Sequence, residues 1–137
     1  PALKQSGVNY IGLPKKFRDA QTQKRKFFWL GKRVQNDMRV ITRNCSFEPS
    51  SPRENDWVDS CLNDIKNAFK WKKPAVISTH RANYVGGLEP SNRDNGLKQL
   101  SLLLKNIESK WPNVIYLTSS QLGDVITGKI SLDEISS

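Results

Sequence analysis

The fold of this 137-residue chain is decided by residues 75–84, which read Ala75-Val76-Ile77-Ser78-Thr79-His80-Arg81-Ala82-Asn83-Tyr84. A short apolar run that is closed by polar residues predicts a β-strand that ends in a loop. Similar runs occur at residues 8–13, 38–43 and 114–118, so that the four predicted strands start 30 to 40 residues apart. Because parallel strands need a long crossover between them, this spacing predicts an α/β fold made of parallel βα units.

Helices are predicted where apolar residues recur every three or four positions. The first follows the start signal Ser51-Pro52-Arg53-Glu54 and has its apolar face within residues 58–69. The second spans residues 92–111, and a third is predicted between residues 119 and 128. Residues 131–134 indicate one more helix cap near the end of the chain.

Four βα units with short strands amount to half of an eight-unit barrel. We therefore expect residues 1–137 to be a single domain that forms the C-terminal half of a distorted, TIM-like (β/α) barrel. An open half-barrel exposes two sheet edges, and unpaired edges are prone to associate. The chain is thus expected to pair with a missing N-terminal half or to self-associate.

Positive charge is concentrated in the first third of the chain, where residues 1–43 hold eleven Lys and Arg against two Asp. Within it, residues 15–33 interleave basic residues with the cluster Phe27-Phe28-Trp29. Residues 17–34 fit either a helix with one buried side or a long loop with an anchored tip. Such a segment suggests, as an alternative function, a non-catalytic module that binds nucleic acid or an acidic glycan. Nucleic acid is the less favoured partner because no nucleic-acid-binding motif occurs. No apolar run is long enough to predict a membrane span.

The candidate catalytic residue is His80, which is the one histidine of the chain and follows a predicted strand. Working residues of parallel βα proteins gather at the carboxyl ends of strands, where an imidazole can act as a general acid or base. Glu48, Arg81, Asn83 and Arg93 occupy neighbouring polar loops and are candidate substrate-binding residues. The alternative is that His80 caps the strand end and that the charged side chains connect loops.

Two other chemistries find less support in the sequence. Cys45 could act as a nucleophile, but the one imidazole available to activate it is His80. A lone histidine without a Cys pair or an H-x-x-x-H pair supplies a single good nitrogen ligand. The sequence therefore predicts no metal site formed by this chain alone.

A family resemblance rests on Lys73-Pro74-Ala75-Val76-Ile77-Ser78-Thr79-His80, Asn92-Arg93, Trp111-Pro112-Asn113-Val114 and Thr118-Ser119-Ser120-Gln121-Leu122. With these residues the chain resembles the C-terminal part of polysaccharide deacetylase-like proteins, most strongly over residues 71–126. In that family a strand that ends in Leu-x-His closes the catalytic barrel, and Ser78 occupies the leucine position here.

The resemblance implies a metal-dependent hydrolase that removes acetyl groups from a carbohydrate, with a divalent metal such as zinc as cofactor. It implies that His80 is the general acid and that the protein is secreted or lies in the cell envelope. The family's base aspartate and its metal ligands come from earlier strands, and nothing in this sequence matches them. We therefore expect this chain alone to be inactive. A further alternative is a glycosidase on a related barrel, which needs paired carboxylates, and Glu48 is the one plausible member.

Overall fold

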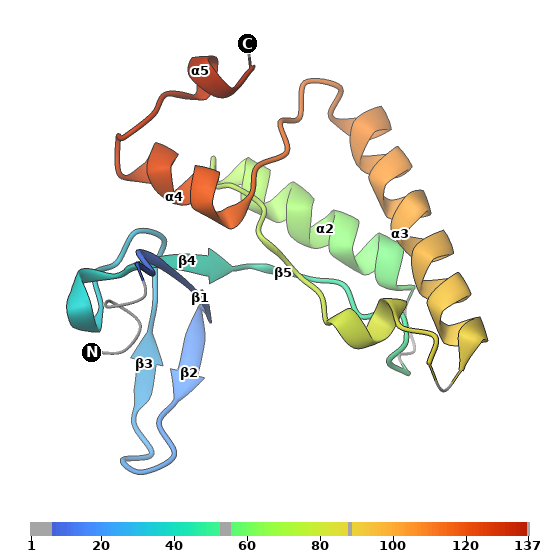
Figure 1. Ribbon diagram of the computed structural model, residues 1–137, viewed down its shortest axis with the longest axis horizontal. Helices are drawn as coiled ribbons and strands as arrows, with labels where there is room; N and C mark the ends of the chain where they lie inside the picture. The colour runs from blue at the N-terminus through green and yellow to red at the C-terminus, as the bar shows by residue number, and fades with distance from the viewer. Residues whose placement is uncertain (1–6, 53–55, 88, 137) are drawn as a thin grey trace. The chain divides into compact units, whose positions relative to one another are not determined.

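The computed structural model describes residues 7–52, 56–87 and 89–136 (Figure 1). Contacts divide the chain into two compact units, one formed by residues 1–43 and 115–137 and the other by residues 44–114. The described residues form three two-stranded sheets, of which two are parallel and one is antiparallel. None of the described helices is long and apolar enough to cross a bilayer.

The first unit is built on the parallel pair of β1 (Tyr10–Pro14) and β4 (Arg39–Arg43), which correspond to two of the predicted strands. Helix α4 (Ser119–Ile126) packs on both strands, close to its predicted position. Gly123 permits this approach, since a Cβ there would lie 2.6 Å from the ring of Tyr10. The hydroxyl of Tyr10 donates a hydrogen bond to Asp124 (2.6 Å), which fixes the helix on the strand.

The basic segment forms an antiparallel hairpin instead of the predicted helix or loop. β2 (Lys16–Arg18) pairs with β3 (Arg25–Phe27), and every residue of both strands is exposed. Asp19 closes the turn, because its carboxylate accepts hydrogen bonds from the backbone of Gln21 and Thr22. The hairpin and the short helix η1 (Gln35–Asp37) connect β1 to β4, so this parallel crossover is not an α-helix.

The predicted strand at residues 114–118 is wrong, because this segment is described and pairs with no strand. Ile115 and Tyr116 are 45% and 52% exposed, and of this run Val114 packs against the core of the second unit. The predicted cap at Ser131 is confirmed. Ser131 and Glu134 exchange backbone-to-side-chain hydrogen bonds at the start of α5 (Leu132–Ser136).

The second unit pairs α2 (Trp57–Lys70) with α3 (Pro90–Lys110), which lie side by side in Figure 1. α2 begins later than predicted, since Asp56 caps it by accepting hydrogen bonds from the first turn, the shorter being 2.7 Å long. Of the predicted start signal, residues 53 and 54 lie outside the described residues. The apolar faces of both helices enclose one core with Phe47, and its members are Cys45, Phe47, Val58, Cys61, Leu62, Ile65, Leu103 and Ile107.

A short parallel pair completes the second unit, where β5 (Cys45–Ser46) lies beside β6 (Ile77–Ser78). The side chain of Asn44 extends this pairing by accepting a hydrogen bond from the backbone of Val76 (2.7 Å). The short helix η2 (Arg81–Tyr84) follows β6 and packs directly on α3 at Gly96. A Cβ at Gly96 would lie 1.9 Å from the carbonyl oxygen of Asn83, so the contact requires glycine.

Candidate functional site

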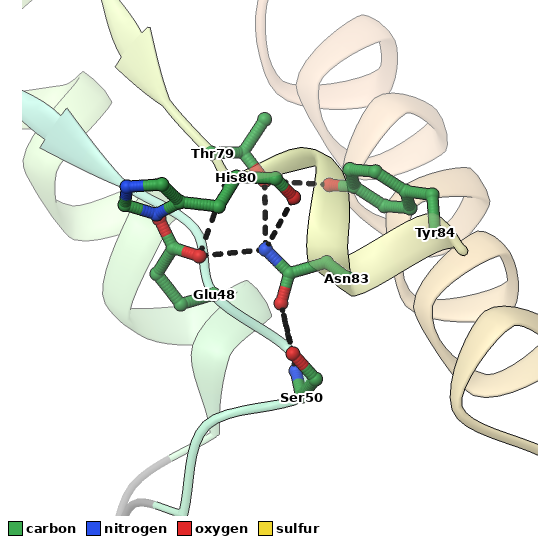
Figure 2. Close-up of polar contacts among 6 residues, drawn as sticks. All are labelled: Glu48, Ser50, Thr79, His80, Asn83 and Tyr84. Atoms are coloured by element: carbon green, nitrogen blue, oxygen red, sulfur yellow. Dashed lines mark hydrogen bonds and ion pairs between the residues drawn. The ribbon is translucent and has the colours of Figure 1, made fainter. Parts of the chain in front are cut away.

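Two polar residues predicted in separate loops meet at the carboxyl end of the β5–β6 pair. Ser46 lies opposite Ser78 in this parallel pair, and Glu48 and His80 each follow two residues later. Side chains alternate along extended chain, so the equal offset places both side chains on one side. A hydrogen bond from the Phe47 backbone N–H to the carbonyl of Ser78 (2.9 Å) keeps the two segments together. Figure 2 shows the carboxylate and the imidazole facing each other.

Glu48 and His80 form a hydrogen-bonded acid–base pair, called here the Glu48–His80 dyad. Nδ1 of His80 lies 2.6 Å from Oε1 of Glu48, and the backbone N–H of His80 donates to Oε2 at 3.3 Å. The side chain of Glu48 is 18% exposed, whereas that of His80 is 75% exposed. Burial raises the pKa of Glu48, but hydrogen bonds from Asn83 and His80 outweigh it, so the pKa lies below its ordinary value.

The dyad fixes which nitrogen of His80 is available for chemistry. An ionised carboxylate only accepts hydrogen bonds, so Nδ1 of the neutral imidazole must carry the proton that faces Glu48. Nε2 then has a free lone pair, and in the cationic imidazole it carries a proton that it can donate. Because most of the imidazole is exposed, a substrate can reach Nε2. His80 can therefore take up or release a proton at this atom.

Asn83 orients the carboxylate of the dyad from the buried side. It is 1% exposed, and its Nδ2 lies 2.6 Å from Oε2 of Glu48, 2.9 Å from the carbonyl of His80 and 3.3 Å from Oγ1 of Thr79. Its Oδ1 accepts hydrogen bonds from the backbone N–H of Ser50 (3.1 Å) and from the Ser50 hydroxyl (Figure 2). The carboxamide thus connects the loop after β5 to the loop after β6. These contacts make Asn83 a positioning residue for Glu48.

A second polar contact connects the end of β6 to the end of η2. Oγ1 of Thr79 and the hydroxyl of Tyr84 are 2.8 Å apart. Burial raises the pKa of Tyr84 above its ordinary value. The hydrogen bond with Thr79 lowers this pKa, and the charge of Glu48 raises it further. The phenol therefore stays neutral at physiological pH and helps to hold the turn that carries Asn83.

The two arginines predicted to bind substrate are both exposed, at positions 81 and 93. Arg81 belongs to η2, directly after His80. Arg93 lies in the first turn of α3, and its Nε is 3.0 Å from the carboxylate of Asp94. Arg81 is thus the arginine next to the dyad in sequence, while the guanidinium of Arg93 already has an acidic partner.

Cys45 is placed in the core, away from nucleophilic chemistry. It is 2% exposed and Cys61 is fully buried, and both are free thiols. Burial, with smaller contributions from Cys61 and Asp64, raises the pKa of Cys45 to about 12. Since the thiolate is the reactive form of cysteine, this thiol is inert at physiological pH.

Metal-binding residues do not gather in the described part of the chain. Over residues 7–52, 56–87 and 89–136, no group of three His, Cys, Asp or Glu side chains is arranged to hold a metal ion. The Glu48–His80 dyad offers one imidazole and one carboxylate that already bind each other. These donors do not fit a metal centre of the usual four ligands.

The sequence identified Glu48, His80 and Asn83 as candidates but did not reveal that they form one hydrogen-bonded group. The equal spacing of Glu48 and His80 from β5 and β6 could not serve as a signal, because the strand predicted before Glu48 ends at residue 43 and β5 was not predicted. Ser50 and Thr79 were missed altogether, because serine and threonine are ordinary loop residues and their contacts depend on the fold.

No family model matches the chain, and neither a curated protein nor a solved structure matches it significantly.

Proposed function

We propose that the Glu48–His80 dyad is the proton-transfer group of a carbohydrate deacetylase-like hydrolase, and that this chain forms the C-terminal part of its (β/α) barrel. The observation that supports the proposal is the hydrogen bond from Nδ1 of His80 to a carboxylate with a lowered pKa, with most of the imidazole exposed. The position of the dyad after two parallel strands agrees with where such folds hold reactive groups. The resemblance over residues 71–126 supplies the reaction class.

In this proposal His80 acts on the leaving nitrogen of an N-acetylated sugar. Water adds to the acyl carbon and gives up a proton to a base outside this chain. The carbon–nitrogen bond then breaks, and Nε2 of His80 gives its proton to the departing nitrogen, which leaves as an amine beside acetate. Glu48 stabilises the imidazolium before transfer and keeps Nε2 directed to the substrate. Asn83 keeps the carboxylate in place, and solvent returns the proton to His80.

The rest of the centre is proposed to lie outside this chain. The resemblance implies a divalent metal, such as zinc, and an aspartate base, and both belong to earlier strands in that family. The described donors do not fit such a metal. The N-terminal half of the barrel is the proposed partner that supplies these groups.

The experiment uses the full natural polypeptide, whose intact mass is measured first to define its length. Acetate release from an N-acetylated chito-oligosaccharide is then followed with added divalent metal. His80→Gln is expected to lower kcat by about 10²- to 10⁴-fold, the usual contribution of a general acid. Lys66→Gln, an exposed change on α2, serves as the matched control and is expected to leave kcat unchanged. Activity that survives His80→Gln, or release of reducing sugar without acetate, would overturn the proposal.

A further inference from the structure

One face of the β2–β3 hairpin gathers positive charge that no ion pair among the described residues balances. Directly opposed residues of an antiparallel pair point to the same face, as do alternate residues of one strand. The register pairs Lys16 with Phe27 and Arg18 with Arg25, so these four side chains share one face, called here the cationic face. All four are exposed, and Phe27 is 50% exposed.

The charges of this face oppose each other in the free protein. Arg18 and Arg25 lie directly across from each other, and like charges in that arrangement destabilise a strand pair. The nearby Asp19 does not relieve them, because it binds Lys26 at 2.7 Å and the backbone of its own turn. Lys26 is paired with Phe17 on the opposite face. No ion pair within the described residues involves Lys16, Arg18 or Arg25, so the free hairpin gains nothing from holding them together.

We propose that the cationic face binds an acidic glycan, through its carboxylate or sulfate groups. Two guanidinium groups side by side can bind such planar or multidentate anions through paired hydrogen bonds. The half-exposed ring of Phe27 adds an apolar surface beside the cations, on which the apolar face of a sugar can rest. An anion between Arg18 and Arg25 removes the repulsion that the free hairpin carries.

The choice of a glycan over a nucleic acid rests in part on the carbohydrate hydrolase proposed above, and in part on the arrangement of the aromatic side chains. Binding of single-stranded nucleic acid uses successive aromatic rings as stacking platforms along a charged groove. On the cationic face one ring, Phe27, accompanies three cations, whereas Phe17 lies on the other face. Lys32 already covers the ring of Trp29, with Nζ 4.3 Å from its centroid. The hairpin therefore provides anion-binding groups without a row of stacking rings.

The test measures binding of the full natural polypeptide to polygalacturonate, to the neutral glycan dextran and to a mixed-sequence single-stranded oligonucleotide. Polygalacturonate is expected to bind most tightly, and more weakly as salt increases. The double variant Arg18→Gln/Arg25→Gln is expected to bind it about tenfold or more weakly, because two charge-assisted contacts are lost. Arg18→Lys/Arg25→Lys keeps the charge but not the paired hydrogen bonds. Its affinity for polygalacturonate is expected to lie between those of the wild type and the glutamine variant.

Lys66→Gln/Lys70→Gln is the matched control, since it removes two positive charges from exposed positions of α2. An equal loss of affinity in this control would overturn the proposal, as would equal binding of dextran. Tighter binding of the oligonucleotide would overturn the proposal by showing that the ligand is a nucleic acid and not a glycan. Because His80→Gln is expected to leave polygalacturonate binding unchanged, failure of the catalytic proposal and failure of this one are separate results.

Discussion

Replacing Asn83 with alanine is expected to lower the free energy of unfolding by about 2–4 kcal/mol. A hydrogen bond to an ionised carboxylate contributes about 1.5–3 kcal/mol and a neutral one about 0.5–1.5 kcal/mol. Asn83 makes one of the first kind with Glu48 and neutral ones with the carbonyl of His80 and with Ser50. Water can reach the partly exposed Glu48 and the exposed Ser50 in the variant, so the expected loss is less than the full sum.

Urea unfolding followed by tryptophan fluorescence measures this loss, since Trp57, Trp71 and Trp111 all lie in the second unit. Asn106→Ala is the matched control, because Asn106 is partly exposed and its Nδ2 bonds one carbonyl within α3. It is expected to change the stability by about 0.5 kcal/mol or less. Equal losses in the two variants would refute the reasoning that Asn83 is a buried connection between the two loops.

The same substitution also tests the positioning role of Asn83. His80 is the one histidine of the chain, so its ring nitrogens are resolved without overlap by NMR. The wild-type neutral ring is expected to carry its proton on Nδ1, and Asn83→Ala to give a mixture of tautomers. Asn83→Asp is expected to disturb the dyad more, because it places a second carboxylate beside Glu48. An unchanged tautomer in both variants would show that Glu48 needs no support from Asn83.

Two further predictions concern the same unit. Gly96→Ala is expected to destabilise the protein by about 2 kcal/mol in urea unfolding. The cost of overpacking against the carbonyl of Asn83 exceeds the gain of roughly 1 kcal/mol in helix propensity. A more stable variant would contradict the direct packing of η2 on α3. Because the pKa of Glu48 is lowered on folding, its ionisation stabilises the protein above the ordinary glutamate pKa, and this stabilisation is lost as pH falls through the lowered value. The stability difference between wild type and Glu48→Gln, measured by urea unfolding from about pH 7 to pH 3, is therefore expected to shrink toward low pH, and a constant difference would exclude this linkage.

Elements with a strong local pattern could be predicted from the sequence. Two strands, β1 and β4, and the helices α3 and α4 lie close to their predicted positions. β4 and α3 bury apolar residues such as Val40, Ile41, Leu103 and Ile107, and Thr118 with Gln121 forms a capping box at the start of α4. The start of α2 was misplaced because Asp56 competes with Ser51 as a cap, and both residues are good helix caps.

The hairpin and the segment 114–118 show where local patterns mislead. β2 and β3 bury no face, so no alternation of apolar and polar residues marks them as strands. Residues 114–118 have the apolar composition of a strand, yet they pair with no strand among the described residues. A strand exists only when another segment offers a partner, and that partner is not encoded in the segment itself.

The site was predictable residue by residue but not as a group. Glu48 and His80 could be chosen because each follows a predicted strand, yet their contact depends on the register between β5 and β6. Register is a property of two segments about 32 residues apart, and no local signal in either one specifies it. The buried position of Asn83 likewise follows from the packing of η2 on α3 at Gly96.

The equal spacing of Glu48 and His80 from their strands makes this site sensitive to changes in chain length. Phe47 and Thr79 are the single residues between each strand end and its member of the dyad. Inserting or deleting one residue at either place would turn one side chain to the opposite face, as a one-residue slip does in any strand. Homologous proteins that use the dyad should therefore preserve the number of residues at these two places, whereas the turn after Asp19 can vary in length. Counting residues between the strands and the dyad is thus a simple criterion for finding other proteins that have the same dyad.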